Sequence, residues 1–195
     1  MASFILASQS PRRKSLLEWA EIPFEIIVSD SDESFPATML INEVPEYIAK
    51  HKAKDVEAKI IHEQPNVEDA CIIAADTVVV LDNTIMGKPV DRADAIASLT
   101  KLSGKTHQVI TGVCILYNGI VESFSETTQV SFHELTNTQI EYYVDHYKPF
   151  DKAGGYAIQE WIGVVGIQSI QGDFYNVMGL PVSRLLQKIK QLNLL

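Results

Sequence analysis

One continuous apolar run constrains the fold more than any other feature of the chain. Residues 71–81 read Cys-Ile-Ile-Ala-Ala-Asp-Thr-Val-Val-Val-Leu, which is rich in β-branched residues and shows no polar alternation. This pattern is typical of a strand covered on both faces, as in α/β proteins. Burying the carboxylate of Asp76 in such a strand is costly unless a cation, a metal ion or several hydrogen bonds compensate it.

Two interpretations of Asp76 are open. In the first, the strand ends early and Asp76 caps a turn. In the second, the strand continues through Asp76 and the chain uses the carboxylate. Three valines and a leucine follow almost directly, at 78–81, and this favours the second interpretation.

Strand and helix patterns alternate along the rest of the chain, which predicts an α/β fold with a mixed β-sheet and flanking helices. We expect one domain over residues 1–195, with a linker over 64–69 and a hairpin turn at Asn118–Gly119. The other predicted strands cover 4–7, 24–28, 84–86, 108–117, 120–132 and 163–170. Five helices are predicted. The first begins at Pro11 with Ser10 as N-cap, the second runs from near 43–45 to near 60, and the third runs from 91 to near 102. The fourth begins at the capping box Thr136–Gln139 and ends near 147, and the last begins near Pro181.

Composition excludes several classes of protein. The net charge of −9 disfavours a nucleic-acid surface, which normally carries a basic patch. No apolar stretch approaches the roughly 18 residues of a membrane span, and the N-terminus lacks the pattern of a signal peptide. Cys71 and Cys114 lie in apolar strand-like segments, so we expect two small buried residues and a reducing, cytoplasmic compartment.

The first candidate site follows the first predicted strand. Ser8, Ser10, Arg12 and Arg13 surround a helix N-terminus, where free N–H groups and the helix dipole favour phosphate. Guanidinium groups match phosphate oxygens in pairs. The alternative is a capped helix with two solvated arginines.

Further candidates are single charged residues. Lys52 lies between Ile48 and Val56 at spacings of four, so it shares their helix face and either extends past the core to solvent or points at an anion. Glu33 belongs to an acidic loop that is either solvated or, together with Asp76, a Mg²⁺ site. Lys88 lies in the turn Gly87–Pro89, for which ordinary turn chemistry is the alternative.

The last candidate segment, 151–159, contains paired glycines that would let the backbone approach a ligand. Its Gln159 offers both a donor and an acceptor, which suits a nucleobase edge.

Three other patterns that could indicate a functional site do not match their motifs. Residues 103–106 resemble the end of a P-loop, but Leu99 stands where the pattern needs glycine. The five histidines lack metal-ligand spacing, and no serine or cysteine nucleophile motif is present.

Six blocks, in order, resemble the Maf family of nucleoside triphosphate pyrophosphatases. They lie at 7–13, 74–79, 87–89, 102–112, 151–159 and 179–181. The resemblance implies a fold similar to that of the inosine triphosphate pyrophosphatases, with two lobes around a deep cleft. It also implies cleavage between the α and β phosphates, a divalent metal (Mg²⁺ or Mn²⁺), and a homodimer.

The resemblance also implies roles for individual residues. Asp76 matches the proton acceptor of the family, and Glu33 falls at a position that resembles a cleft residue. That Glu33 and Asp76 share a metal ion stays the hypothesis drawn above from the residues themselves. Arg12, Thr77 and Gln159 match the substrate-discriminating positions. The resemblance makes Lys52 and Lys88 phosphate contacts. The helix N-terminus argued above adds Ser8, Ser10, Arg12 and Arg13 to the expected phosphate-binding residues.

Gln159 resembles the subgroup that acts on dTTP and UTP, because the subgroup preferring 7-methyl-GTP usually has an acid there. A 7-methyl-GTP-type pyrophosphatase is therefore one alternative. A nucleotide-binding regulator of cell division with little turnover is another, and a substrate panel separates the three.

Overall fold

The strand that contains Asp76 is an inner strand of a mixed sheet. In the computed structural model, which describes residues 3–63 and 69–195, β3 (Ala70–Leu81) is continuous over 12 residues and is buried at all but two of them. The prediction that the strand continues through Asp76 is confirmed. The predicted linker at 64–69 lies, apart from Asp69, outside the described residues.

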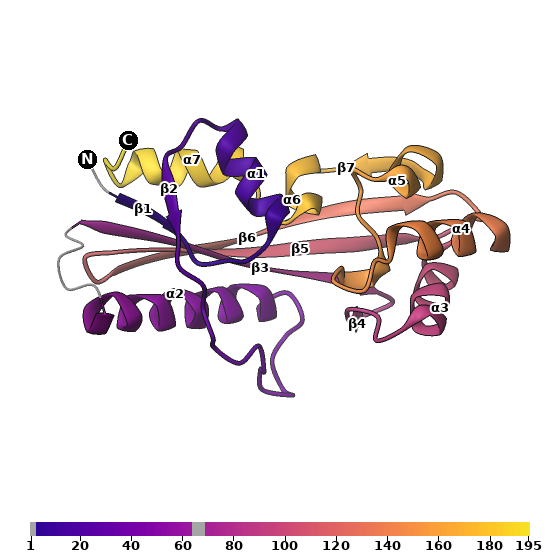
Figure 1. Cartoon of the computed structure of the whole chain (residues 1–195), viewed down its shortest axis with the longest axis horizontal. Helices are drawn as coiled ribbons and strands as arrows, with labels where there is room; N and C mark the ends of the chain where they lie inside the picture. The colour runs from indigo at the N-terminus through magenta and orange to yellow at the C-terminus, as the bar shows by residue number, and fades with distance from the viewer. Residues whose placement is uncertain (1–2, 64–68) are drawn as a thin grey trace. The chain divides into compact units, whose positions relative to one another are not determined.

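The described strands form one sheet in the order β2-β1-β3-β5-β6-β7, with β4 paired to β3 (Figure 1). β1 is parallel to both β2 and β3, whereas β4 is antiparallel to β3 and β7 is antiparallel to β6. The predicted α/β class with a mixed sheet is therefore confirmed. The strand bounds are β1 (Ser3–Leu6), β2 (Phe24–Ile26), β4 (Thr84–Met86), β5 (Thr106–Tyr117), β6 (Ile120–Phe132) and β7 (Ile167–Gln171).

Contacts within the chain group into two compact units. Unit 1 comprises residues 1–76, 111–126 and 179–195, and unit 2 comprises residues 77–110 and 127–178. Strands β3, β5 and β6 each contribute residues to both units. The single domain over 1–195 and the deep cleft stay predictions.

Unit 1 places helices on both faces of its strands (Figure 1): α2 (Val44–Glu63) covers one face, and α1 (Pro11–Trp19) and α7 (Val182–Gln191) cover the other. The apolar stripe of α2 packs against β1, β3 and β5. Its core contains Ala49, Ala53, Val56, Ile5, Ile72, Ala74 and Cys114. Because this stripe is buried, the rotation of α2 about its axis is fixed, and so is the direction in which Lys52 leaves the helix.

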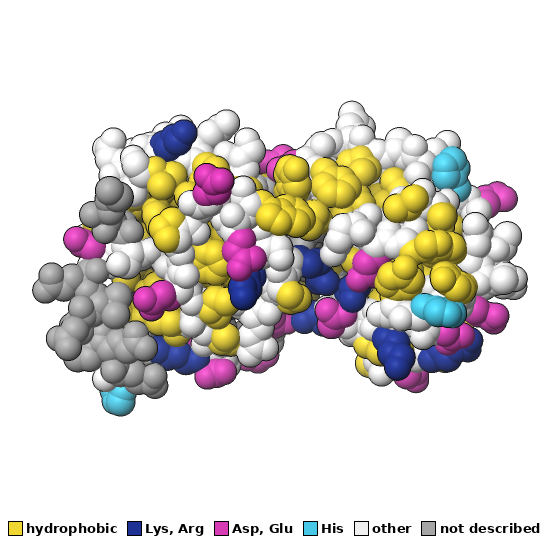
Figure 2. All heavy atoms as spheres, turned by 45° about the horizontal axis from the view of Figure 1, so that its top comes forward, with side chains coloured by type: hydrophobic (Ala, Val, Ile, Leu, Met, Phe, Trp, Pro, Cys, Tyr) yellow, Lys and Arg dark blue, Asp and Glu magenta, His cyan; other side chains and the backbone are white. Residues whose placement is uncertain are grey.

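Unit 2 contains α3 (Arg92–Leu102), α4 (Asn137–Tyr147), a 3₁₀ turn (Ala153–Gly155), α5 (Trp161–Gly166) and α6 (Phe174–Met178). Helix α3 packs against both α4 and the 3₁₀ turn. Hydrophobic side chains gather on the α4–α5 side of this unit in Figure 2; Tyr142 and Val164 of these helices are exposed. No described helix is both long and apolar enough to cross a membrane.

Caps and turns lie where the sequence predicts them. Ser10 caps α1, and Thr136 forms a complete capping box with Gln139 at α4. Asp91, predicted as the first residue of a helix, is the N-cap of α3. Asn118 and Gly119 both have positive φ (48° and 76°), the geometry of a tight hairpin turn that joins β5 to β6.

The predicted strand over 163–170 is wrong in its first half. Residues 161–166 form α5, and β7 begins only at Ile167. The β-branched pair Val164–Val165 suggested a strand, but both side chains are exposed and gain nothing from a sheet. Gly163 instead donates its N–H to the carbonyl of Glu160, which starts a helical turn. The short helix α6 and the 3₁₀ turn were not predicted.

Candidate active site

Asp76 is buried in the interior of β3 with a cation beside it. Only 9% of the residue is exposed, and its Oδ1 accepts a hydrogen bond from Lys52 Nζ at 2.8 Å. This ammonium supplies the compensation that the apolar strand requires. The carboxylate therefore lies in a strand whose flanking residues are rigidly packed.

Lys52 bonds to a second carboxylate. Its Nζ lies 2.6 Å from Oε1 of Glu33, in the loop that follows β2. Ile48 and Val56, one turn to either side of Lys52, are buried. Of the two alternatives for Lys52, the structure therefore supports the one in which it points at an anion. We call Glu33, Lys52 and Asp76 the carboxylate–lysine cluster.

Two further residues of α2 hold the loop that carries Glu33. Asp55 Oδ2 accepts hydrogen bonds from Ser29 Oγ at 2.9 Å and from the Asp30 amide at 2.8 Å. Lys59 Nζ donates to the Val28 carbonyl at 2.7 Å and to Asp30 at 2.6 Å. Neither residue was predicted from the sequence, although both lie on one side of the same helix, three and seven positions after Lys52.

The loop between β1 and α1 forms its own network. Ser8 Oγ accepts hydrogen bonds from the Ser10 amide at 3.2 Å and from Arg13 Nη1 at 3.1 Å. Arg13 Nε also donates to the Gly179 carbonyl at 2.8 Å, and Ser10 Oγ accepts from the Arg13 amide as the helix cap. These bonds fix the Arg13 guanidinium in a buried position, whereas Arg12 is half-buried.

The electrostatics of Arg13 connect this loop to the cluster. Burial lowers the pKa of the Arg13 guanidinium from its usual value and Arg12 lowers it further, whereas the negative charges of Asp76 and Glu33 raise it. Unit 1 therefore brings Arg13 within electrostatic range of Arg12 and of both carboxylates.

Two candidate segments meet in unit 2. The Gly154 amide donates to the Gly87 carbonyl at 3.1 Å, which joins the turn that carries Lys88 to the 3₁₀ turn. Gly154 and Gly155 both have positive φ (69° and 73°), and a Cβ at Gly154 would lie 3.0 Å from Val79. Only glycine fits this approach to β3 without strain. Lys88 itself is exposed, and Thr77 is half-buried in β3.

Comparison with known proteins now decides the family. Residues 3–192 match the profile described as Maf-like protein. This chain belongs to the Maf family.

Named relatives cover almost the whole of this Maf chain. The dTTP/UTP pyrophosphatase of Phocaeicola vulgatus is 50% identical over 189 residues, which is 96% of this chain and 95% of the relative. The dTTP/UTP pyrophosphatase of Parabacteroides distasonis is 48% identical over 187 residues, 95% of this chain and 94% of the relative. That of Cytophaga hutchinsonii is 48% identical, over 96% of this chain and 83% of the relative.

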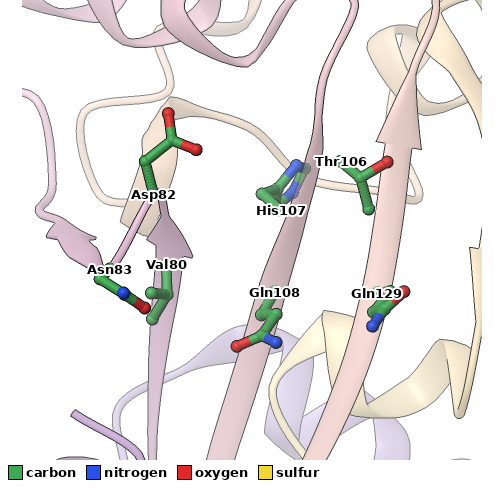
Figure 3. A pocket seen from close by; sticks show the side chains of 7 residues that line it. All are labelled: Val80, Asp82, Asn83, Thr106, His107, Gln108 and Gln129. Carbon is green, nitrogen blue, oxygen red and sulfur yellow. The ribbon is translucent and has the colours of Figure 1, made fainter.

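A hollow on the sheet of unit 2 is unrelated to the candidate residues of this Maf protein. Its volume is about 270 Å³, and Figure 3 shows the side chains that line it. They come from the end of β3 and the turn after it, the start of β5, and β6: Val80, Asp82, Asn83, Thr106, His107, Gln108 and Gln129. No residue that the sequence analysis singled out for chemistry lines it.

The two cysteines of this Maf chain are buried and free, as predicted. Burial raises the pKa of the Cys71 thiol to about 12 and that of the Cys114 thiol to about 11. Both thiols therefore stay protonated at neutral pH, which suits neither a nucleophile nor a metal ligand.

Proposed function

We propose that this chain is a nucleoside triphosphate pyrophosphatase that hydrolyses dTTP and UTP to the nucleoside monophosphate and pyrophosphate. The observation that carries the proposal is the carboxylate–lysine cluster, because an acid in the middle of a buried strand has no structural need to be there. The relatives named dTTP/UTP pyrophosphatase supply the substrate class.

Asp76 is the proposed general base. Its carboxylate accepts a proton from the water whose oxygen attacks the α-phosphorus; the bond from that phosphorus to the oxygen shared with the β-phosphorus then breaks, and pyrophosphate leaves. Lys52 orients Asp76 through the bond at 2.8 Å. A base that cannot rotate away from the water lowers the entropic part of the barrier.

The phosphate chain is proposed to bind to Ser8, Ser10, Arg12, Arg13, Lys52 and Lys88. Because Arg13 already bonds to Ser8 and Gly179, it would act as a fixed positive charge. Arg12 and Lys88 are less buried and would supply direct bonds to phosphate oxygens. Such preorganised cations stabilise the charge that develops on pyrophosphate.

The cluster also fits a divalent cation. Mg²⁺ takes one or two protein carboxylates together with substrate phosphate oxygens and water, and the structure brings Glu33 and Asp76 to one ammonium. Within residues 3–63 and 69–195, no group of three or more His, Cys, Asp or Glu forms a metal site. When bound there, Mg²⁺ or Mn²⁺ would neutralise the phosphate oxygens.

Base selection is proposed to rest on Arg12, Thr77 and Gln159. Gln159 is exposed on its loop, and its amide carries the donor and the acceptor that a pyrimidine edge requires.

A cytoplasmic location agrees with the two free thiols. The homodimer implied by the family resemblance stays an expectation.

The decisive experiment is a substrate panel. Purified protein with Mg²⁺ is incubated with dTTP, UTP, CTP, GTP and 7-methyl-GTP, and pyrophosphate is assayed separately from orthophosphate. We expect pyrophosphate from dTTP and UTP. Pyrophosphate from 7-methyl-GTP alone would overturn the pyrimidine assignment, and orthophosphate alone would overturn the site of cleavage. Binding without turnover would favour the regulator.

The same panel tests the base. Asp76→Asn should lower kcat at least about 100-fold, because it removes the proton acceptor and keeps the shape. Asp82→Asn is the matched control: it makes the same change just beyond the end of β3, where Asp82 is exposed. Substantial kcat in Asp76→Asn would show that another group accepts the proton.

A further inference from the structure

Gln159 lies at the tip of a tight turn that is preceded by buried residues and followed by the half-buried Glu160. The Glu160 amide donates to the Ala157 carbonyl at 3.1 Å, which makes Ile158 and Gln159 the two central residues. Ala157 and Ile158 are each only 5% exposed, whereas Gln159 is exposed. A buried frame therefore presents one projecting amide.

A single hydroxyl group bonds to both ends of this turn. Tyr143 Oη, on α4, accepts a hydrogen bond from the Ala157 amide at 3.1 Å. The same hydroxyl donates to the carboxylate of Glu160. Tyr143 is fully buried, and a hydroxyl that both donates and accepts has most of its bonding capacity used here. Ala157 and Glu160 are the residues immediately before and after the Ile158–Gln159 pair.

The other sides of the turn are also constrained. Glu160 lies 3.6 Å from the ammonium of Lys152, a buried lysine that also pairs with Asp151 at 2.7 Å. Gly163 packs so closely on the turn that a Cβ there would lie 1.7 Å from the Ile158 carbonyl oxygen. The ring of Tyr142 lies 4.8 Å from that of Trp161, which ties α4 to the residue after Glu160.

We infer that Tyr143 is a positioning residue for base selection, and that its hydroxyl fixes both ends of the Ile158–Gln159 turn so that the Gln159 amide presents its donor and acceptor in one orientation. The inference rests on the proposed role of Gln159 in reading the base. A fixed amide distinguishes uracil from cytosine, since the two bases exchange a donor and an acceptor on this edge. If the turn moves, the Gln159 amide can rotate to suit either base, and the discrimination between uracil and cytosine is lost.

Tyr143→Phe tests the inference, because it removes the hydroxyl and keeps the ring. We expect the ratio of kcat/KM for UTP to that for CTP to fall about tenfold, the usual effect of one buried hydrogen bond. The change should come mainly from KM for UTP, with kcat for UTP nearly unchanged. Tyr147→Phe is the matched control: Tyr147 stacks on Tyr143 at 5.0 Å, lies on the same helix and is exposed.

Gln159→Ala separates this inference from the function it rests on. If Gln159→Ala and Tyr143→Phe both flatten the UTP/CTP ratio, the inference is supported. If only Gln159→Ala flattens it, Gln159 reads the base but Tyr143 does not position it. If Gln159→Ala leaves the ratio unchanged, the base-reading role fails and the inference fails with it, while pyrophosphate release still stands.

A second variant guards against misfolding. Glu160→Gln keeps an acceptor oxygen for the Tyr143 hydroxyl but removes the charge, so it should lower the UTP/CTP ratio less than Tyr143→Phe does. An equal loss of kcat on every substrate, with the ratio unchanged, would mean that the hydroxyl only stabilises the fold and would overturn the inference. Circular dichroism and the thermal midpoint confirm that each variant is folded.

Discussion

Lys52 bonds to two carboxylates that differ in exposure. The side chain of Asp76 is 13% exposed and that of Glu33 is 51% exposed. A buried pair loses much more free energy than an exposed pair when one partner is removed. The ion pair between Lys52 and Asp76 therefore contributes more to the stability of the fold than the pair with Glu33. The Glu33 carboxylate can bind another group at little cost in stability.

Glu33→Gln should separate these roles. Because the exposed pair is worth about 0–1 kcal/mol, the thermal midpoint should hardly change. If Glu33 helps to hold the cation, the Mg²⁺ concentration for half-maximal activity should rise about tenfold. Asp32→Asn is the control in the same loop. Asp32 accepts a hydrogen bond from the Ser34 amide at 3.1 Å, and an asparagine can accept the same bond. Identical Mg²⁺ curves for Glu33→Gln and the unaltered protein would exclude Glu33 as a metal ligand.

Individual residues were predictable to different degrees. Asp76 and Lys52 were predictable because each is a charged residue among apolar residues of its strand or helix face. This pattern is visible in the sequence. Asp55 and Tyr143 were not, because each acts through a loop whose approach to the helix is decided by tertiary packing.

Among the elements, α2 has the most direct effect on the cluster. Its first turn touches β5 at Gly112, where a Cβ would lie 2.1 Å from the Glu46 amide nitrogen. Glu46 is further tied down by Ser123 Oγ, which donates to it at 2.6 Å. The closeness of helix and strand therefore depends on the absence of a side chain at Gly112.

Gly112→Ala should push α2 away from the sheet. We expect a loss of roughly 1–3 kcal/mol in the free energy of unfolding, from urea titration, together with lower kcat because Lys52 moves with the helix. Gly87→Ala is the control, since nothing lies within 4 Å of a Cβ there. An unchanged urea midpoint in Gly112→Ala would show that the helix relaxes without cost.

Elements were predictable where local signals agree with packing. Helices α3 and α4 have caps and apolar periodicity that favour the same boundaries. Residues 161–166 were misread because their β-branched composition favours a strand, whereas contacts with the preceding turn impose a helix. These contacts join backbone groups only three and five residues apart, at Glu160 and Ile158, and they leave no periodic trace in the sequence.

At the scale of the whole molecule, His107 links stability to pH. It is 2% exposed, its Nε2 lies 2.7 Å from Tyr156 Oη, and its Nδ1 has no hydrogen-bond partner among the described residues. Burial lowers the pKa of His107 from 6.5 to about 4. Between these values the unfolded chain binds more protons than the folded one, so stability rises with pH across this window.

Acidification from pH 6.5 to 4 should therefore remove on the order of 3 kcal/mol of stability through His107 alone. The measurement is the free energy of unfolding against pH for the unaltered protein and for His107→Gln. On acidification the unaltered protein should lose more free energy of unfolding than His107→Gln does, and the excess should be the contribution of His107. His133→Gln, which replaces an exposed histidine, should follow the unaltered curve. Parallel curves for all three proteins would mean that folding leaves the pKa of His107 unchanged, which would contradict the effect of burial.

The division of the chain between the units also sets an order of assembly during synthesis. Every residue of unit 2 precedes Gly179, whereas unit 1 needs β1 from the first residues and α7 from beyond Gly179. A ribosome that has just translated Met178 has made all of unit 2 but has yet to make α7. The apolar surface of unit 1 that α7 covers must therefore stay exposed to chaperones until the ribosome has translated α7.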